Sequence, residues 1–126
     1  MKRTNNFTLV EIIAVLLIIA IMAAVAAPKF INLADDARKG IAQAGINEAK
    51  ASLSVAYVKA YLDKNKPGGA GGNPTNTEVM TAANFTSPVI FGDVSVAFDT
   101  DTAGVISLTG TYDSATATGT WNVPAN

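Results

Sequence analysis

The sequence predicts an α+β fold, in which a long amino-terminal helix packs against a small antiparallel sheet of three or four strands. Two patterns predict the helix. The first is an unbroken apolar run from Ile12 to Ala27, and the second is a set of apolar residues at three- and four-residue steps from Phe30 to Tyr61. A third pattern predicts the sheet, because apolar and polar residues alternate from Val94 onward.

The first apolar segment is long enough to cross a membrane. From Phe7 to Ala27 it has about 21 residues, which at about 1.5 Å per residue reach roughly 32 Å, against a bilayer core of about 30 Å. Lys2 and Arg3 precede the segment, and the residues between are uncharged. The positive-inside tendency therefore predicts a single anchor with its amino end in the cytoplasm and everything after Lys29 outside.

Glu11 is the exception within this apolar segment. A charged side chain at the middle of a membrane helix costs roughly 2.5–3.5 kcal/mol on insertion scales, and somewhat less near an end. We therefore expect Glu11 to be a functional group with a partner.

The amino-terminal residues resemble those of the type IV pilins and of their relatives, the pseudopilins of type II secretion. The likeness rests on a short basic leader (residues 1–6), the run Phe7-Thr8-Leu9-Val10-Glu11-Ile12, and Pro28 at the family's spacing. The resemblance implies that a prepilin peptidase cuts between Asn6 and Phe7 and that the new amino group of Phe7 is methylated. The family normally has Gly immediately before the cut, where this chain has Asn6.

The resemblance also implies a function and a set of partners. Mature subunits would polymerise into a helical homo-oligomeric filament through their apolar helices, and Glu11 would pair with the amino group of Phe7 on the same chain or on a neighbour. The other implied partners are membrane lipid before assembly and an inner-membrane assembly platform with its ATPase. The precursor would lie in the bacterial inner membrane, and the filament would be extracellular, or periplasmic for a pseudopilin.

Several alternatives remain open from the sequence. A pseudopilin would form a short periplasmic piston, and a minor pilin would cap or prime filaments. A plain secretory signal peptide would use Lys2 and Arg3 as its basic region and the run Ala24-Val25-Ala26 as its cleavage site. Glu11 interrupts such a signal, however, and the apolar run is longer than the usual 7–15 residues. A simple single-pass anchor is the remaining alternative.

Beyond the segment at residues 7–28, the helix is predicted to continue as an amphipathic stretch over residues 29–66. Pro28 has no amide proton and its ring crowds the preceding turn, so we expect a kink or a loosened turn there. A flexible Gly/Pro-rich loop is predicted at residues 67–77, because Gly and Pro both disfavour helix. Its glycines lack the Gly-Lys-Ser/Thr ending of a phosphate loop.

Residues 78–126 are predicted to form the head region, with a short helical turn at residues 78–85 and then the sheet. Turn residues at 99–104 and 113–114 separate the strands, and the last strand alternates Thr with smaller or aromatic residues. The aromatic residues expected in the core beneath the sheet are Phe85, Phe91, Phe98, Tyr112 and Trp121.

Composition excludes several functions. The chain has no Cys and no His, so a disulfide, a thiol nucleophile, a zinc site and His-based acid/base chemistry are ruled out and no enzyme or cofactor is expected. Asp99, Asp101 and Gly104 resemble the start of a calcium loop, but Ala103 stands where an oxygen ligand is needed, so no metal is expected. All bases lie at or before Lys66, and the acidic remainder is not expected to bind nucleic acid.

Overall fold

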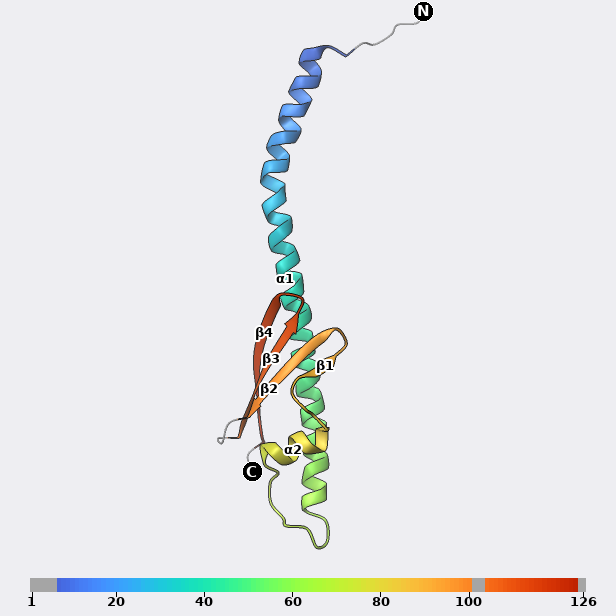
Figure 1. Ribbon diagram of the computed structural model, residues 1–126, viewed down its shortest axis with the longest axis vertical. Helices are drawn as coiled ribbons and strands as arrows, with labels where there is room; N and C mark the ends of the chain where they lie inside the picture. The colour runs from blue at the N-terminus through green and yellow to red at the C-terminus, as the bar shows by residue number, and fades with distance from the viewer. Residues whose placement is uncertain (1–6, 101–103, 125–126) are drawn as a thin grey trace, which may run out of the picture. The chain divides into compact units, whose positions relative to one another are not determined.

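The structure is a computed structural model that describes residues 7–100 and 104–124 (Figure 1). In these residues two helices precede four strands. The helices are α1 (Leu9–Lys64) and α2 (Asn76–Ala83), and the strands are β1 (Val89–Phe91), β2 (Val94–Thr100), β3 (Val105–Tyr112) and β4 (Ala115–Asn122). The leader with Asn6 lies outside the described residues, as does Asp101 of the calcium-like turn.

The chain divides into two compact units, residues 1–36 and 37–126, and the division falls within α1. The described part of the first unit consists of the amino-terminal part of α1 and the two residues before it. This helix continues through Pro28, so the proline does not end it. The kink expected at Pro28 stays a prediction.

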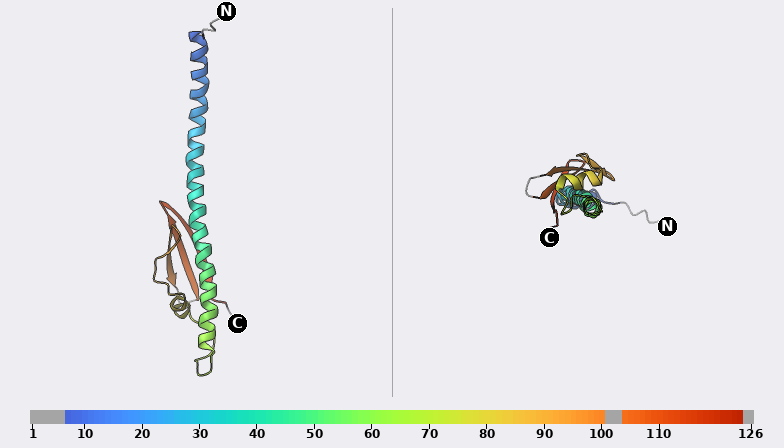
Figure 2. Two further views of the ribbon diagram at one scale, coloured as in Figure 1. Left: turned by 90° about the vertical axis from the view of Figure 1, so that its right-hand side faces the viewer. Right: turned by 90° about the horizontal axis from the view of Figure 1, so that it is seen from below.

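In the second unit the remainder of α1 lies against one face of the sheet (Figure 2). The sheet is an antiparallel meander in the order β1-β2-β3-β4, which confirms the predicted α+β fold with the upper of the two expected strand numbers. The core between helix and sheet is made of small and branched apolar side chains. Its fully buried members include Ile46, Ala49, Leu53, Val79, Val96 and Ile106.

The alternation seen in the sequence sets which residues face this core. Val94 and Val96 of β2 and Ile106 and Leu108 of β3 are buried, while the residues between them are more exposed. The predicted aromatic residues also pack there. Trp121 is a member of the buried cluster and the other four pack against it as partly buried side chains. Phe85, which follows α2, stacks on Phe98 with ring centroids 5.0 Å apart.

Two glycines allow α1 and the sheet to approach closely. A Cβ atom on Gly45 of α1 would lie 2.6 Å from Cγ1 of Val94, and one on Gly110 of β3 would lie 2.7 Å from the backbone oxygen of Ala42. Both distances are shorter than real carbon contacts. The contact between helix and sheet therefore depends on the absence of a side chain at these positions.

The connection between the helices lies two residues earlier than the sequence predicts, at residues 65–75 in place of residues 67–77. α1 ends at Lys64 and α2 already begins at Asn76, ahead of the helical turn expected from Glu78. The Asn65 amide group donates to the backbone oxygens of Tyr61 (2.9 Å) and Gly72 (3.0 Å), and its side-chain oxygen accepts from the Gly72 amide at 3.1 Å. These bonds tie the loop to the end of α1, and the flexibility expected of the loop stays a prediction.

Candidate assembly segment

The amino-terminal part of α1 carries an apolar surface that the chain itself does not cover. The helix is long and apolar enough to cross a membrane, and none of the residues in its most apolar stretch is buried. A helix that is apolar all round is normally buried in protein or lipid. The large apolar side chains that are at least about half exposed in this segment are Phe7, Leu9, Val10, Ile12, Ile13, Val15, Leu16, Leu17, Ile18, Ile19, Ile21, Met22 and Val25.

Glu11 lies in the first turn of this helix, where it is bonded to Thr8. The Glu11 amide donates to Thr8 Oγ1 at 3.2 Å, and the Thr8 amide donates to Glu11 Oε2 at 3.4 Å. This reciprocal pair is the capping box that a Thr-x-x-Glu sequence forms at the start of a helix. The carboxylate therefore has a local role in starting α1, at the beginning of its apolar stretch.

The position of Phe7 relates this cap to the predicted charge pair. Phe7 immediately precedes Thr8 and is 74% exposed, and its nitrogen is a peptide nitrogen while residues 1–6 remain attached. Cleavage before Phe7 would place an amino group one residue from the amide that already bonds Glu11. An ion pair between the new amino group of Phe7 and the carboxylate of Glu11 in one chain would thus join groups that already lie close in the sequence.

Two ion pairs tie α1 to other elements of the second unit. Arg38 Nε lies 2.9 Å from Asp113 Oδ2 in the turn between β3 and β4. Lys64 Nζ lies 2.8 Å from Glu78 Oε2 in the first turn of α2. Lys64, followed by the Thr75 amide, holds the pKa of Glu78 below its ordinary value of 4.5. Both pairs join an end of the head region to the helix.

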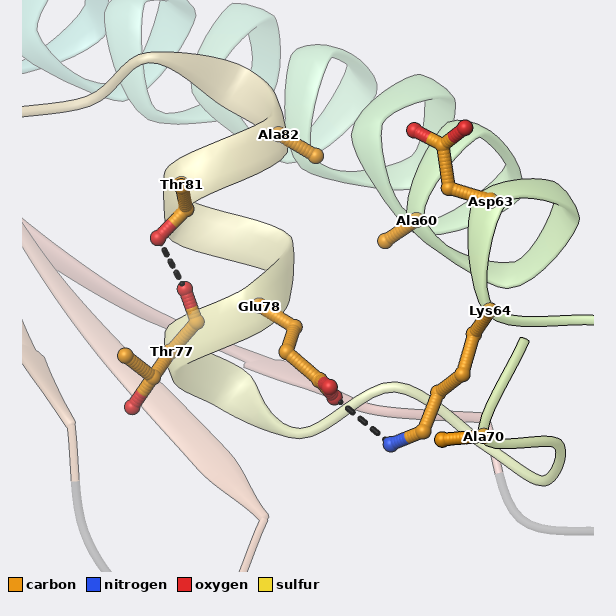
Figure 3. A pocket seen from close by; sticks show the side chains of 8 residues that line it. All are labelled: Ala60, Asp63, Lys64, Ala70, Thr77, Glu78, Thr81 and Ala82. Carbon is orange, nitrogen blue, oxygen red and sulfur yellow. Dashed lines mark hydrogen bonds and ion pairs between the residues drawn. The ribbon is translucent and has the colours of Figure 1, made fainter. Parts of the chain in front are cut away.

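A surface pocket of about 430 Å³ lies between the end of α1 and α2, and Figure 3 shows its lining. Lys64 and Glu78 point toward one another at one side of it, and the small side chains of Ala60 and Ala82 line another part. Among the described residues no group of three or more acidic side chains is placed to hold a metal ion. Of the polar side chains that line the pocket, Lys64 and Glu78 are the two whose ion pair joins α1 to α2.

The structure thus places the predicted site residues in different surroundings. Phe7 and Glu11 belong to the start of α1 and Pro28 to its interior. Asn6, on the other side of the predicted cut, lies outside the residues that the structure describes. Sequence reasoning missed Thr8 as the partner of Glu11, and it missed Thr75 as the partner of Glu78. In both cases a Thr-x-x-Glu spacing before a helix could have revealed the pair.

A long helix that is apolar in its first part and lies against a four-stranded antiparallel sheet in its second part defines a pilin-like α+β protein. The model of the prokaryotic N-terminal methylation motif matches residues 1–27. The chain is also 35% identical over 78 residues to the type IV narrow pilus major component PilA5 of Thermus thermophilus. No solved structure matched the chain.

The match to PilA5 covers 62% of this chain and 59% of that protein, so it spans less than two thirds of the relative's length. Together with the methylation motif it supports the type IV pilin family, as the resemblance in the amino-terminal residues indicated. Pilins are structural subunits and not enzymes. The two matches therefore support a pilin-like subunit.

Proposed function

We propose that this chain is a filament subunit that is cut before Phe7 by a prepilin peptidase, methylated on the new amino group of Phe7, and polymerised through α1. The precursor is anchored in the inner membrane with its amino end in the cytoplasm. An assembly platform and its ATPase move it from lipid into an extracellular filament.

The observation that carries this proposal is the uncovered apolar surface of the first part of α1. In the precursor lipid covers that surface, and in a filament the same side chains pack against equivalent helices of other subunits. Exchange of lipid contacts for protein contacts is the kind of association that close packing drives in apolar surroundings. The second unit, residues 37–126, has its own buried core between the helix and the sheet, so it can remain folded on either side of this exchange.

The relative supports a pilus subunit over the alternatives. PilA5 is described as a major component of a narrow type IV pilus. A major component is the repeated subunit of its fibre, whereas a minor pilin primes or caps one and a pseudopilin forms a periplasmic piston. We therefore assign this chain the repeated structural role.

Glu11 is given two roles in this proposal, and they belong to different stages. In the precursor its carboxylate caps α1 through Thr8. In the filament it lies among apolar helices, where a carboxylate needs a cation, and the amino group of Phe7 supplies one after cleavage. Methylation leaves that amine basic, so the pair survives the modification.

The test uses Glu11→Gln, which separates the two roles. A Gln side chain can still accept the Thr8 amide bond in a capping box but carries no charge. We expect Glu11→Gln to insert into the membrane and lose its leader, yet to give sharply reduced fibre yield. Breaking one side of a buried ion pair typically costs about 3–5 kcal/mol, and this cost recurs at every subunit. Fibre yield is measured by electron microscopy and immunoblot of the sheared fraction.

Thr8→Ala is the matched control, because it removes the cap partner and keeps the charge. Loss of an N-cap costs about 1 kcal/mol, which a helix packed among others can absorb, so fibres should persist. Normal fibre yield from fully processed Glu11→Gln would remove the charge from the mechanism. Loss of fibres with Thr8→Ala alone would show that the cap, and not the pair, is what assembly needs.

A further inference from the structure

One edge of the sheet, the outer side of β4, has none of the features that usually prevent edge strands from pairing. β4 is eight residues long and closes the sheet on that side. It contains no charged residue and no proline, and its register with β3 runs without interruption from Ala115 to Asn122. Long, uncharged, regular edge strands are templates for pairing with another chain.

The opposite edge is protected. β1 has only three residues, Val89–Phe91, and Pro88 directly precedes it. A short strand offers few free backbone groups, and proline has no amide to donate. The two edges of one sheet therefore differ: β1 has features that prevent pairing with another strand, and β4 does not.

The register shows which backbone groups of β4 are free. Tyr112 pairs with Ala115 across the two-residue turn that joins β3 to β4, and the residues that close such a turn are hydrogen-bonded to each other. Because hydrogen-bonded and non-hydrogen-bonded pairs alternate along an antiparallel ladder, the N–H and C=O groups of Thr116, Thr118 and Thr120 are directed away from β3. All three residues have exposed side chains.

The threonines of β4 are placed symmetrically about Thr118, with a small residue on each side of it. Thr116 mirrors Thr120, Ala117 mirrors Gly119, and Ala115 mirrors Trp121. In an antiparallel pair of two such strands, threonines meet threonines on the outer face. On the inner face small residues meet small residues, and the large indole meets a methyl group.

We propose that β4 pairs with β4 of a second copy of this chain, antiparallel and centred on Thr118, so that the two sheets become one. The occupant is a second copy because the strand is complementary to itself in its hydroxyl pattern and its small inner residues and has no charged side chain of its own. The inner face of β4 already lies on α1, since a Cβ atom on Gly119 would meet Ile46 and Lys50. A second copy can therefore contact β4 only along its free edge, in the plane of the sheet.

The symmetry of this contact distinguishes it from filament assembly. The twofold axis of an antiparallel edge pair stands perpendicular to the sheet, so it also reverses the part of α1 that packs on the sheet. The two helices run in opposite directions, which two neighbouring subunits of one polar filament do not do. The pairing thus joins copies from separate assemblies, and it does not depend on whether the chain forms filaments.

The test introduces a single cysteine into a chain that has none. In the proposed pair the two Thr118 Cα atoms lie about 5.5 Å apart, within the range of about 4.4–6.8 Å that a disulfide spans. We expect the full-length Thr118→Cys protein in detergent micelles, under mild oxidation, to form a disulfide-linked dimer. The readout is a non-reducing gel, with the far-ultraviolet circular dichroism of each variant as a check of its fold.

Thr109→Cys is the matched control, because Thr109 is exposed on the same face and sits opposite Thr118 in the register. Its twin would lie three strand spacings away, about 14 Å, and could not form a disulfide. We expect near-complete loss of the dimer band in this variant. Equal dimer from both variants, or none from Thr118→Cys, would overturn the proposal.

A mixture experiment tests the register. In the proposed pair Thr116 faces Thr120 of the second copy, so Thr116→Cys mixed with Thr120→Cys should give the linked dimer. Either variant alone should give little, since identical positions are then about 13 Å apart along the strands. A pair of β4 strands in another register would give a dimer from one variant alone, and that result would reject the centre at Thr118.

Discussion

Glu78 performs two structural tasks with one oxygen atom. Oε2 accepts the Thr75 amide at 2.7 Å, which caps α2, and it accepts Lys64 Nζ at 2.8 Å, which ties α2 to the end of α1. Lys64 also donates to the backbone oxygen of Asn73 at 3.0 Å. The loop between the helices is therefore fixed at its far end by Glu78 and at its near end by Asn65.

The lowered pKa of Glu78 predicts a pH dependence of stability. A carboxyl whose pKa is lower in the folded state contributes stability above its unfolded value, near 4.5, and loses it as the pH falls through the folded value. We expect Glu78→Gln to lower the melting temperature at pH 7. The difference from the unmodified chain should shrink as the pH falls below about 4.5. Thermal unfolding followed by circular dichroism between pH 7 and pH 3 measures this.

Asp63→Asn is the control for that measurement. Asp63 is a neighbouring carboxylate whose partner Lys66 lies 3.5 Å away, with both side chains more than 60% exposed. Exposed pairs of this kind contribute little, so this variant should follow the unmodified chain at every pH. A difference for Glu78→Gln that is the same at pH 7 and pH 3 would contradict the assigned role of its charge.

At the level of elements, the contact between α1 and the sheet is built from small residues. Ala42, Gly45, Ala49 and Ala56 line the buried face of the helix. They bring the helix backbone close to the strands and leave the larger side chains of Ile46 and Leu53 to fill the space between. Such a contact tolerates little added volume, because interiors are close-packed.

Two glycines in α1 give a paired test of this packing. Gly45→Ala places a methyl group where Val94 already lies, and we expect it to destabilise the head by about 1–3 kcal/mol. Gly40→Ala meets no atom within 4 Å, so it should stabilise the helix by roughly 0.5–1 kcal/mol through propensity alone. Urea unfolding followed by the fluorescence of Trp121, the single tryptophan, reports both changes. Equal effects of the two substitutions would contradict the close contact.

The sequence predicts well those elements that follow from neighbouring residues or from a regular spacing of apolar residues. The alternation of Val94, Val96 and Phe98 depends on one buried face, and the structure confirms it. The bonds that hold the loop could not be predicted in the same way, because Asn65 bonds to Gly72 seven residues away and the glycine content of the loop does not indicate that partner. The glycine contacts of α1 were missed for a similar reason, since they depend on strands far along the chain.

For the whole molecule, the chain separates into a unit whose described helix is exposed and apolar and a unit with its own buried core. The candidate site could be proposed from the sequence because Phe7, Glu11 and Pro28 lie within one continuous stretch, and their roles stay predictions. The second surface, the edge of β4, became visible only once the register placed that strand at the end of the sheet. The symmetric placement of threonines in β4 indicates a contact only once two things are known: which strand β4 pairs with, and which of its edges is free.

Leader removal is the step on which the other proposed events depend, because it creates the amino group that Glu11 is to bind. Asn6 stands where the family has Gly, and a side chain at that position hinders entry into a tight peptidase site. We expect Asn6→Gly to speed cleavage, seen as a faster size shift on an immunoblot after induction. Asn5→Gly is the control, since it removes the same side chain one residue from the cut and should leave the rate unchanged.

Mass spectrometry of the mature amino terminus decides between the two kinds of processing. A methylated Phe7 supports the prepilin peptidase, whereas a mature end at Ala27 would support a secretory signal peptide and would remove the first part of α1 from the product. Equal rates for Asn6→Gly and the unmodified chain would mean that the peptidase accepts Asn6 as readily as Gly. In that case leader removal would not limit assembly of the unmodified chain, and a loss of fibres from fully processed Glu11→Gln could be assigned to the missing charge.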